Sequence, residues 1–226
     1  MSLREHSPGI FYLNLGREEL LVTRNLAPGR NVYGEPLINF DEVEYRSWNP
    51  TRSKLGAAII KGLKTNSIKP GSRVLYLGVA SGTTVSHVSD IIGHSGHVWG
   101  VDFAPRPLRD LIDNVARYRK NISPILGDAR QPQNYSLQVP KVEVIFADVA
   151  QPDQAEIVVK NIRFFLKSGG YAMLSIKSRS IDVGRDPVII FAEQTAILRK
   201  NGLEILELIE LDPYEKDHAL AVVKLP

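Results

Sequence analysis

Three aspartates stand at the ends of three successive segments that have the pattern of buried strands. Asp102 closes HVWGVD, Asp128 follows ISPILG, and Asp148 closes VEVIFAD. The carboxyl ends of parallel strands meet at one edge of an open α/β sheet, and ligands bind in the crevice outside that edge. One such acid alone is adequately explained as a cap for the next helix or turn. Three acids in register favour a binding site instead.

A glycine-containing loop, LYLGVASGTT, leads from the first strand of this series into a helix. Gly78 and Gly82 lack a Cβ, so the backbone can turn tightly there and approach a ligand closely. The N–H groups at the start of the following helix favour a carboxylate or phosphate. The spacing Gly-x-x-x-Gly matches neither the Walker motif nor the dinucleotide fingerprint. An ordinary tight turn explains the loop alone equally well.

The acids and the loop together restrict the class of ligand. Asp102 follows Gly82 by twenty residues, a placement from which an acid binds both hydroxyls of a ribose. NAD would bring its pyrophosphate beside the acids with no basic residue in the loop to compensate. S-adenosylmethionine carries a ribose, an α-ammonium and a sulfonium, which suit a crevice of carboxylates. We therefore expect a cationic nucleoside as the ligand.

Two lysines and a histidine occupy positions from which they could act at this crevice. Lys54 begins the helix after the Asn-Pro pair, Lys177 ends the fifth strand, and His218 begins the last strand. Methyl transfer to a sugar hydroxyl requires a general base within hydrogen-bond reach, and a neutral lysine can serve. Asp148 is expected beside Lys177 on the neighbouring strand, where it would orient the lysines. The alternative is that all these groups are solvated surface charges.

Six arginines follow strand ends or open helices on the expected side of the crevice, from which they could bind the phosphates of a chain substrate. In a protein with 28 lysines and arginines, scattered surface arginines are also expected without any such role. The six are Arg52, Arg106, Arg109, Arg130, Arg179 and Arg185.

These residues need a scaffold, and hydrophobic patterning predicts one in two parts. Up to residue 50, runs such as GIFYLNL, ELLVTRN, PLINF and VEYRSW alternate with Gly and Pro turn signals. This pattern predicts a small β-rich N-terminal domain over 1–50. Over 51–226, strand and helix patterns alternate, which predicts an α/β domain with a mainly parallel, doubly wound sheet and helices on both of its faces.

Capping and turn signals predict several boundaries within the second part. Asp153 is expected to cap the helix DQAEIVVKNIRFFLK, Gly169 and Gly170 to end it, and Gly202 to close the next helix. The last two strands, LEILELIEL and HALAVVKL, are joined by only five residues, DPYEK. A link this short cannot form a parallel crossover, so the two strands are expected to pair antiparallel.

Composition excludes several classes of protein. The 226 residues are 43% hydrophobic and 23% charged, which excludes a disordered tail, a collagen-like repeat and a coiled coil. There is no cysteine, so disulfides, thiolate metal sites and a cysteine nucleophile are excluded. No apolar run approaches the length of a membrane span, so no membrane partner is expected. The net charge of +3 permits contact with nucleic acid without arguing for it.

Seven segments spread over nearly the whole chain closely resemble the fibrillarin family. They are NPTRSKLGAAI, VLYLGVASGTTVSHVSDIIG, GVDFAPR, GDARQP, ADVAQPDQ, IKSRSIDV and DPYEKDHA. The resemblance implies a class I S-adenosylmethionine-dependent methyltransferase fold, with an antiparallel last strand, behind a small β-rich N-terminal domain. It also implies that S-adenosyl-L-methionine is the cofactor for 2′-O-methylation of ribose in rRNA and tRNA.

The resemblance further implies partners and a location. Family members are the methyltransferase subunit of box C/D guide-RNA particles, with a Nop-domain scaffold protein and a kink-turn-binding ribosomal-type protein. The guide RNA selects the nucleotide in the substrate rRNA or tRNA by base pairing. Eukaryotic members carry a Gly-Arg-rich N-terminal extension, and this chain has none. The chain therefore resembles archaeal members, for which a cytoplasmic location is expected.

Family positions transfer to this sequence by motif. Thr83 and Thr84 would contact the methionine end of the cofactor, and Asp102 with Phe103 would hold its ribose and adenine. The catalytic set of the family corresponds to Lys54, Asp148, Lys177 and His218, with Lys177 favoured as the base. The expected cofactor-binding residues are Gly78, Ala80, Ser81, Gly82, Thr83, Thr84, Asp102, Phe103, Asp128, Ala129, Asp148, Val149, Ala150 and Gln151. No metal site is expected.

Asp102 departs from the family pattern, which commonly has Glu at the ribose-binding position. The acid is retained with a side chain one methylene shorter. Two other functions remain open from the sequence. One is a standalone methyltransferase for a small hydroxylated molecule, and the other is an assembly subunit that has kept the fold without the activity.

Overall fold

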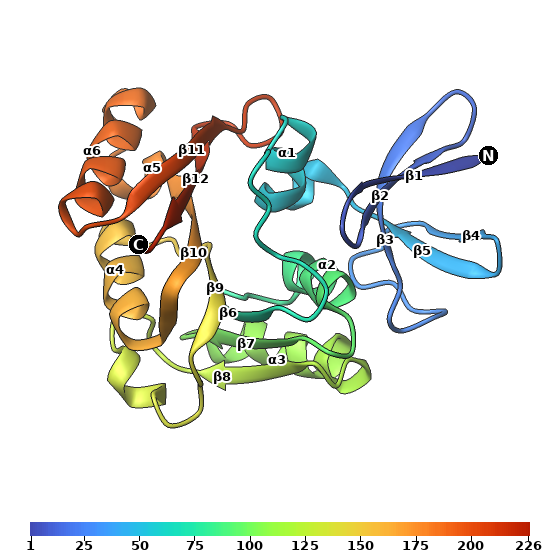
Figure 1. The fold of residues 1–226 in the computed structure, drawn as a ribbon, viewed down its shortest axis with the longest axis horizontal. Coiled ribbons are helices and arrows are strands. Elements are labelled where there is room, and N and C mark those ends of the chain that lie inside the picture. The colour runs from blue at the N-terminus through green and yellow to red at the C-terminus, as the bar shows by residue number, and fades with distance from the viewer.

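The computed structural model describes residues 1–226 as two β-sheets, with helices packed on the larger one (Figure 1). The smaller sheet is wholly antiparallel, in the order β1-β2-β3-β5-β4. The four runs that predicted strands before residue 50 all form them. The first strand was not predicted, because its residues are polar and mostly exposed. The strands are β1 Ser2–Ser7, β2 Ile10–Asn14, β3 Glu19–Arg24, β4 Leu37–Phe40 and β5 Val43–Ser47.

The larger sheet has seven strands in the order β11-β12-β10-β9-β6-β7-β8. Neighbours from β10 to β8 pair parallel, whereas β12 pairs antiparallel with both β10 and β11. The antiparallel pairing predicted for the last two strands is confirmed. The parallel strands bring their carboxyl ends to one edge of the sheet. The strands are β6 Arg73–Leu77, β7 His97–Asp102, β8 Ile122–Leu126, β9 Val142–Ala147, β10 Leu166–Lys177, β11 Glu204–Glu210 and β12 His218–Lys224.

Helices cover both faces of the larger sheet, as predicted, and each face has its own apolar core. The cluster of 28 buried residues that includes Ile157 and Ile190 lies under α4 and α6, and the cluster of 27 that includes Val85 and Leu108 lies under α1, α2 and α3. The helices are α1 Lys54–Ile60, α2 Thr83–Ile92, α3 Pro105–Asn114, α4 Gln154–Phe165, α5 Ser178–Ile181 and α6 Pro187–Lys200, with 3₁₀ turns at Pro50–Arg52, Ala116–Tyr118 and Pro132–Tyr135.

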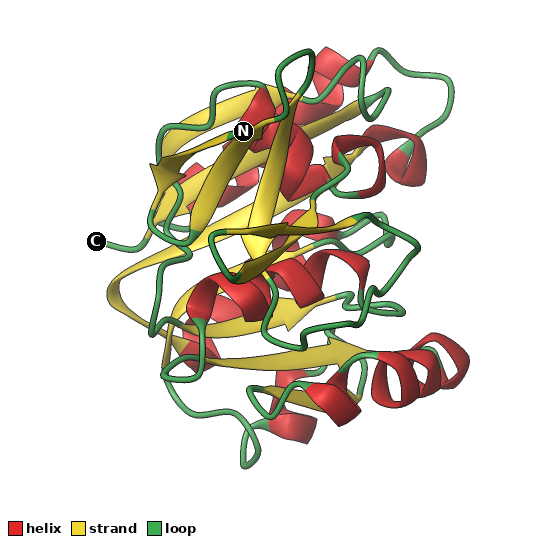
Figure 2. Cartoon of the chain, turned by 90° about the vertical axis from the view of Figure 1, so that its right-hand side faces the viewer, coloured by secondary structure: helices red, strands yellow, loops and turns green.

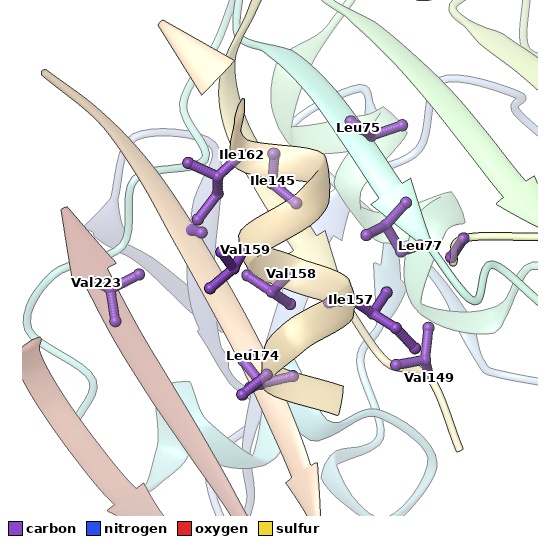
Figure 3. Packing of buried hydrophobic residues seen from close by; sticks show 14 of the residues in the cluster. Leu75, Leu77, Ile145, Val149, Ile157, Val158, Val159, Ile162, Leu174 and Val223 are labelled. Carbon is purple, nitrogen blue, oxygen red and sulfur yellow. The ribbon is translucent and has the colours of Figure 1, made fainter. Parts of the chain in front are cut away.

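Figure 3 shows how α4 packs on its face of the sheet. Its apolar side chains, among them Val158 and Ile162, point toward Ile145 of β9 and Leu174 of β10. Figure 2 looks onto the smaller sheet, whose strands lie in front of the helices of the larger part. None of the helices combines the length and the apolar character needed to cross a bilayer.

The predicted capping of α4 is wrong, whereas the predicted end of α6 is confirmed. Asp153 occupies the N-cap position but makes no capping hydrogen bond, because its carboxylate pairs with Arg130 at 2.8 Å. Gly202 follows α6 with a left-handed φ of +81°, the conformation that glycine adopts most readily after a helix.

The glycine pair predicted to end α4 lies instead in the following strand. The helix ends at Phe165 and β10 begins at Leu166. The pairing of β10 with β9 is irregular over this stretch, and Gly169 N–H donates to the carbonyl of Leu225 at 2.9 Å. The glycines therefore serve a bend at the start of the strand, a role that the local sequence does not distinguish from a helix stop.

A buried cluster of charges joins the smaller sheet to the larger part of the molecule. The Arg46 guanidinium of β5 contacts Glu35 at 2.6 Å and Asp90 of α2 at 2.7 Å. Arg119 contacts the other oxygen of Asp90 at 3.1 Å. All four side chains are at most 1% exposed. Breaking such a buried pair from one side costs about 3–5 kcal/mol, so the cluster holds the two sheets in one arrangement.

His87 of α2 lies beside this cluster and is fully buried. The Thr23 hydroxyl donates to Asp90 at 3.0 Å, so it accepts from Nδ1–H of His87 at 2.8 Å. The Tyr33 hydroxyl forms a hydrogen bond with Nε2 of His87 at 2.8 Å, and Trp48 stacks on the imidazole ring at 4.7 Å between centroids. Burial, with the nearby charges of Arg46 and Arg119, holds the pKa of His87 well below its usual range. The imidazole is therefore neutral in the folded protein.

We expect stability to fall as the pH drops below about 6.5. The unfolded chain binds a proton at its exposed His87 there, while the folded chain does not, so protonation favours unfolding. The contribution reaches about 1.4 kcal/mol per pH unit and continues down to the lowered pKa of the folded state. Urea unfolding of the parent protein and of His87→Gln at pH 7, 6 and 5 measures it.

The substitution His94→Gln provides the control, because His94 is exposed. The His94→Gln protein should lose stability with acidification as the parent does, whereas the slope for His87→Gln should be shallower. An unchanged slope for His87→Gln would contradict the assignment of a neutral buried imidazole.

Candidate active site

A cavity of about 200 Å³ opens at the carboxyl edge of the larger sheet, between the ends of β6, β7, β9 and β10. Most of the residues that the sequence analysis placed at strand ends line this cavity. Half of the lining residues are hydrophobic, and the polar ones include two carboxylates and one ammonium. The lining residues are Gly78, Ala80, Val101, Asp102, Phe103, Gly127, Ala129, Asp148, Val149, Ala150, Gln151 and Lys177.

Gly78 lets the loop after β6 pass directly against the loop after β9. Its φ is +78°, and an added Cβ would lie 2.7 Å from the carbonyl oxygen of Asp148. That atom is backbone, so it cannot move away as a flexible side chain would. Gly82 is also constrained, with a φ of +107° and side chains of α3 and the segment after it closer than 3 Å to a built Cβ. Both glycines of the loop are therefore required by the fold itself.

Asp102 fixes the backbone on both sides of the cavity mouth. Its Oδ2 accepts from Ala80 N–H at 2.8 Å and its Oδ1 from Ala104 N–H at 2.9 Å. Each carboxylate oxygen has a further lone pair for a ligand hydroxyl. Phe103, the next residue, is 64% exposed. A large aromatic ring left in water at a cavity mouth offers a flat face to a base.

The three charged groups predicted to act together lie in direct contact. Asp148 Oδ1 lies 2.9 Å from Nζ of Lys177, and its Oδ2 lies 3.5 Å from Nζ of Lys54. The Lys177 ammonium also donates to the carbonyl of Asp148 at 2.9 Å. These side chains are 16–18% exposed, so they are shielded from water yet accessible from the cavity. Lys177 lines the cavity, whereas Lys54 lies behind Asp148.

Local capping sets the position of Lys54. Ser53 caps α1 by accepting from Gly56 N–H at 3.2 Å, and it also accepts a hydrogen bond from the Thr84 hydroxyl at 3.0 Å. The start of α1 is thereby tied to the start of α2. Lys54 is the first residue of α1, so the backbone from which its side chain reaches Asp148 is held in place.

Glu215 is a fourth charged member of the cluster, and it was not singled out in the sequence. Its Oε1 lies 3.7 Å from Nζ of Lys54, and its side chain is 21% exposed. Lys54 therefore lies between two carboxylates, those of Asp148 and Glu215. The signal that could have found Glu215 is its place in the segment DPYEKDHA, three residues before His218.

His218 lies on the neighbouring strand without contacting the cluster. It pairs directly with Lys177 in the register of β10 and β12, so both project to the same face of the sheet. Its Nδ1 bonds to the carbonyl of Lys216 at 2.6 Å, and it lines a different, shallow cavity. The structure thus joins three of the four predicted catalytic residues directly and brings the fourth to an adjacent position.

Some of the predicted cofactor-binding residues do not line the cavity. Thr83 and Thr84 begin α2 rather than lying in the loop, and the Thr84 hydroxyl points to Ser53. Asp128 accepts from Arg130 N–H at 2.8 Å and forms a turn. Two lining residues were not among those predicted. They are apolar or lack a side chain, and their types carry no chemical signal: Val101 and Gly127.

Three of the six arginines considered for substrate contacts are held by carboxylates. Arg130 pairs with Asp153, Arg179 with Asp217, and Arg185 with Glu193, at 2.8, 2.9 and 2.6 Å. The remaining three have no carboxylate within 4 Å: Arg52, Arg106 and Arg109.

The site is thus a small, half-apolar cavity lined by the Asp102 carboxylate and by Asp148 and Lys177 of the Lys-Asp-Lys cluster. Tyr76 is buried outside the cavity lining, and burial together with the charge of Asp148 holds the pKa of the Tyr76 phenol well above its usual range. Such an arrangement can bind a nucleoside and hold a nearby hydroxyl beside an amine.

Comparison with known proteins identifies one family over the whole length of the chain. A family model described as Fibrillarin matches residues 1–226. The chain is 56% identical over 228 residues to a protein from Thermococcus onnurineus named fibrillarin-like rRNA/tRNA 2'-O-methyltransferase, and the alignment covers 100% of both chains. This chain therefore belongs to the fibrillarin family, and the resemblance expected from the sequence is confirmed.

Two solved structures extend the comparison to three dimensions. Fibrillarin from Aeropyrum pernix, solved with natively bound S-adenosyl-L-methionine, superimposes with a TM-score of 0.92 at 49% identity, covering 99% of this chain and 98% of the other. The matching chain of a fibrillarin/Nop5p complex gives a TM-score of 0.84 at 38% identity, covering 97% and 99%. The class I methyltransferase fold expected behind a small N-terminal β-sheet is confirmed.

Substituting Gly78 by Ala should destabilise the protein more than the same change at Gly62. Both glycines have a positive φ, so both substitutions carry a backbone strain of about 1–2 kcal/mol. Only at Gly78 does the new Cβ also meet backbone, since nothing lies within 4 Å of a Cβ built at Gly62. Urea unfolding of Gly78→Ala and Gly62→Ala measures the difference, and equal losses would show that the contact with Asp148 relaxes freely.

Proposed function

We propose that this chain is the catalytic subunit of a box C/D ribonucleoprotein and methylates the ribose 2′-hydroxyl of guide-selected nucleotides in rRNA and tRNA. The observation that carries the proposal is the Lys54–Asp148–Lys177 cluster at the wall of a cavity whose other charged group is Asp102. The cavity supports nucleoside binding, and the cluster supports chemistry on a hydroxyl. The names of the relatives, all rRNA/tRNA 2'-O-methyltransferases, agree with this pairing.

The residues of the cavity fit S-adenosyl-L-methionine. Gln151 lines the cavity, and its buried Oε1 has no hydrogen-bond partner. An acceptor of this kind suits an ammonium or an exocyclic amine. Asp102 would accept from the ribose hydroxyls and Phe103 would cover the adenine. When bound, the cofactor supplies an electrophilic methyl group on a sulfonium.

Lys177 is the proposed general base. It lines the cavity and Lys54 does not, so the Lys177 amine is the nearer of the two to a hydroxyl presented there. Asp148 holds the Lys177 side chain through its carboxylate and its carbonyl. In its neutral form Lys177 would accept the 2′-hydroxyl proton at Nζ as the oxygen gains its methyl group. Lys54, held by Asp148 and Glu215, would orient the substrate by its positive charge.

His218 is proposed as a contact for the substrate strand rather than as a member of the proton path. It is opposite Lys177 in register but its ring bonds to the backbone of Lys216. Arg52, Arg106 and Arg109, which lack carboxylate partners, are the proposed phosphate contacts around the crevice. Thr83, Thr84 and Asp128 keep their family-derived place in cofactor binding as part of the proposal.

The proposed partners are a Nop-domain scaffold protein, a kink-turn-binding protein and a box C/D guide RNA. A structural relative of this chain was solved as a fibrillarin/Nop5p complex, which supports the scaffold partner. Base pairing by a guide would account for a catalytic subunit with a net charge of only +3. We further propose that residues 1–50 and 51–226 are two domains, held together by the buried charge cluster, and that the protein acts in the cytoplasm of an archaeal cell.

Radiolabelled methyl transfer by the reconstituted particle tests the function. We expect labelled substrate RNA only when chain, scaffold protein, kink-turn-binding protein and matching guide RNA are all present. Transfer to a small hydroxylated molecule by the chain alone would identify a standalone enzyme instead. Particle assembly without cofactor binding, measured by calorimetry, would identify a non-enzymatic subunit.

The substitution Lys177→Ala should abolish methyl transfer while leaving the affinity for S-adenosyl-L-methionine within about twofold, because general-base catalysis contributes roughly 10²–10⁴-fold and the Lys177 amine is not proposed to bind the cofactor. Single-turnover methyl transfer and calorimetry measure the two effects. The exposed Lys200→Ala provides the control. Normal turnover by Lys177→Ala would remove this residue from the role of base.

The substitution Asp102→Ala should weaken binding of S-adenosyl-L-methionine by roughly tenfold or more. The ribose hydroxyls lose their acceptor, and the N–H groups of Ala80 and Ala104 lose the carboxylate that orders the loop. Calorimetric titration measures the affinity, with exposed Asp110→Ala as the control. An affinity equal to that of the parent would contradict the assignment of Asp102 to the ribose.

A further inference from the structure

A second cavity, of about 620 Å³, lies at the opposite edge of the larger sheet. It is formed by the loop before β6, the start of β9 and the start of β10, which are the amino ends of these strands. Strand β6 and its flanking residues separate it from the crevice by roughly 20 Å, at about 3.3 Å per residue. The lining residues are Lys64, Thr65, Asn66, Ser67, Lys69, Pro70, Gly71, Ser72, Glu143, Val144, Lys167, Ser168, Gly169, Gly170 and Tyr171.

The lining of this amino-edge cavity is polar and cationic. Only two of its fifteen residues are hydrophobic, and it carries three lysines against one glutamate. The negative charge of the glutamate is already balanced by neighbouring cations. Glu143 bonds to Lys167 and lies 3.2 Å from Arg73. Burial raises the pKa of Glu143, but these partners together outweigh burial and lower the pKa to about 2. The ammonium groups of Lys64 and Lys69 are therefore free to pair with an anion from outside the chain.

Lys64 and Lys69 have no carboxylate within 4 Å of their ammonium groups. The loop that carries them is nevertheless ordered by specific bonds. Glu207 of β11 accepts from Lys64 N–H at 3.1 Å, and Lys69 N–H donates to the Ser72 hydroxyl at 3.0 Å. The backbone is thus held in place while both ammonium groups extend from it.

Two further polar groups of the same loop are buried without partners. Nδ2 of Asn66 and Oγ of Ser67 have no hydrogen-bond partner, although Asn66 Oδ1 accepts from Ile68 N–H at 3.2 Å. A buried polar group without a partner costs free energy, which a ligand can recover. The Asn66 amide nitrogen and the two lysines can only donate, and the Ser67 hydroxyl can donate as well, so an acceptor such as a phosphate oxygen suits all four groups.

Tyr171 supplies the remaining feature of the lining. It begins the regular part of β10, where it pairs with Lys224 and Val144, and its half-buried ring lines the cavity. Bases of single-stranded RNA stack on exposed aromatic faces beside lysines that hold the phosphates. A volume of about 620 Å³ is within the range of sites that hold a small organic ligand, which a single nucleotide is.

We propose that the amino-edge cavity binds one nucleotide of a single-stranded RNA, with its phosphate held by Lys64 and Lys69 and its base against Tyr171. The site lies on the far side of the sheet from the crevice, so it acts on a different part of an RNA chain from the nucleotide that is methylated. Its occupancy does not require cofactor or methyl transfer, and it is therefore tested independently of the proposed function.

Fluorescence anisotropy of the full chain with a labelled single-stranded oligoribonucleotide, in the absence of cofactor, tests the proposal. The double substitution Lys64→Gln, Lys69→Gln should weaken binding. The slope of log affinity against log salt concentration should become shallower by about 0.7, the value for one phosphate of a single strand. The double substitution Lys120→Gln, Lys200→Gln removes the same charge at exposed positions elsewhere and should leave affinity within about twofold.

The aromatic contact is tested by Tyr171→Leu, which keeps an apolar side chain in the strand and removes the ring. Binding should weaken by about fivefold or more. Ultraviolet crosslinking of a 4-thiouridine oligonucleotide should label the peptide that contains Tyr171. Thermal unfolding of each variant confirms that the fold is retained.

Affinity equal to that of the parent in the Lys64→Gln, Lys69→Gln protein, or crosslinks that avoid the Tyr171 peptide, would overturn the proposal. Loss of binding in the lysine variant with no change in Tyr171→Leu would also overturn it, because the cavity would then hold only a phosphate. Inorganic phosphate distinguishes that case, since it should compete with the oligonucleotide at millimolar concentration only if a free phosphate is the ligand.

Discussion

Asp148 is the residue through which the parts of the active site are held together. Its N–H donates to the carbonyl of Leu77 at 2.9 Å, its own carbonyl accepts from Lys177, and its carboxylate contacts both lysines. A Cβ on residue 78 would lie only 2.7 Å from the same carbonyl oxygen. One residue therefore sets the relative positions of β6, β10 and α1, and the glycine opposite it is a consequence of that close approach.

The strand directions in the larger sheet follow from local patterns, whereas some element boundaries do not. The alternation of strand and helix, with a short final link, was enough to predict parallel strands and an antiparallel end. The capping role predicted for Asp153 failed because Arg130, more than twenty residues earlier in the chain, takes its carboxylate. Gly169 was misplaced for a similar reason, since its partner Leu225 lies at the other end of the domain.

The candidate site shows the same division between local and distant information. The acids at strand ends could be predicted because topology alone brings Asp102 and Asp148 to one edge of the sheet. The contact between Glu215 and Lys54 could not be predicted, because it depends on how the loop before β12 folds over α1. The spacing of residues also gives no sign that the Thr84 hydroxyl turns toward Ser53, away from the crevice.

The charge cluster between the two sheets has a consequence for cutting the chain. A piece that begins after residue 50 would lack Arg46 and Glu35 and would leave Asp90 with Arg119 as its one charged partner. The surface around Asp90, which is buried in the intact chain, would then be exposed. The change of topology near that residue is thus not a place where the molecule separates into autonomous halves. In a truncated protein the Asp90 carboxylate would lose the Arg46 guanidinium, the Thr23 hydroxyl and the N–H of Leu26, all of which bond to it in the intact chain.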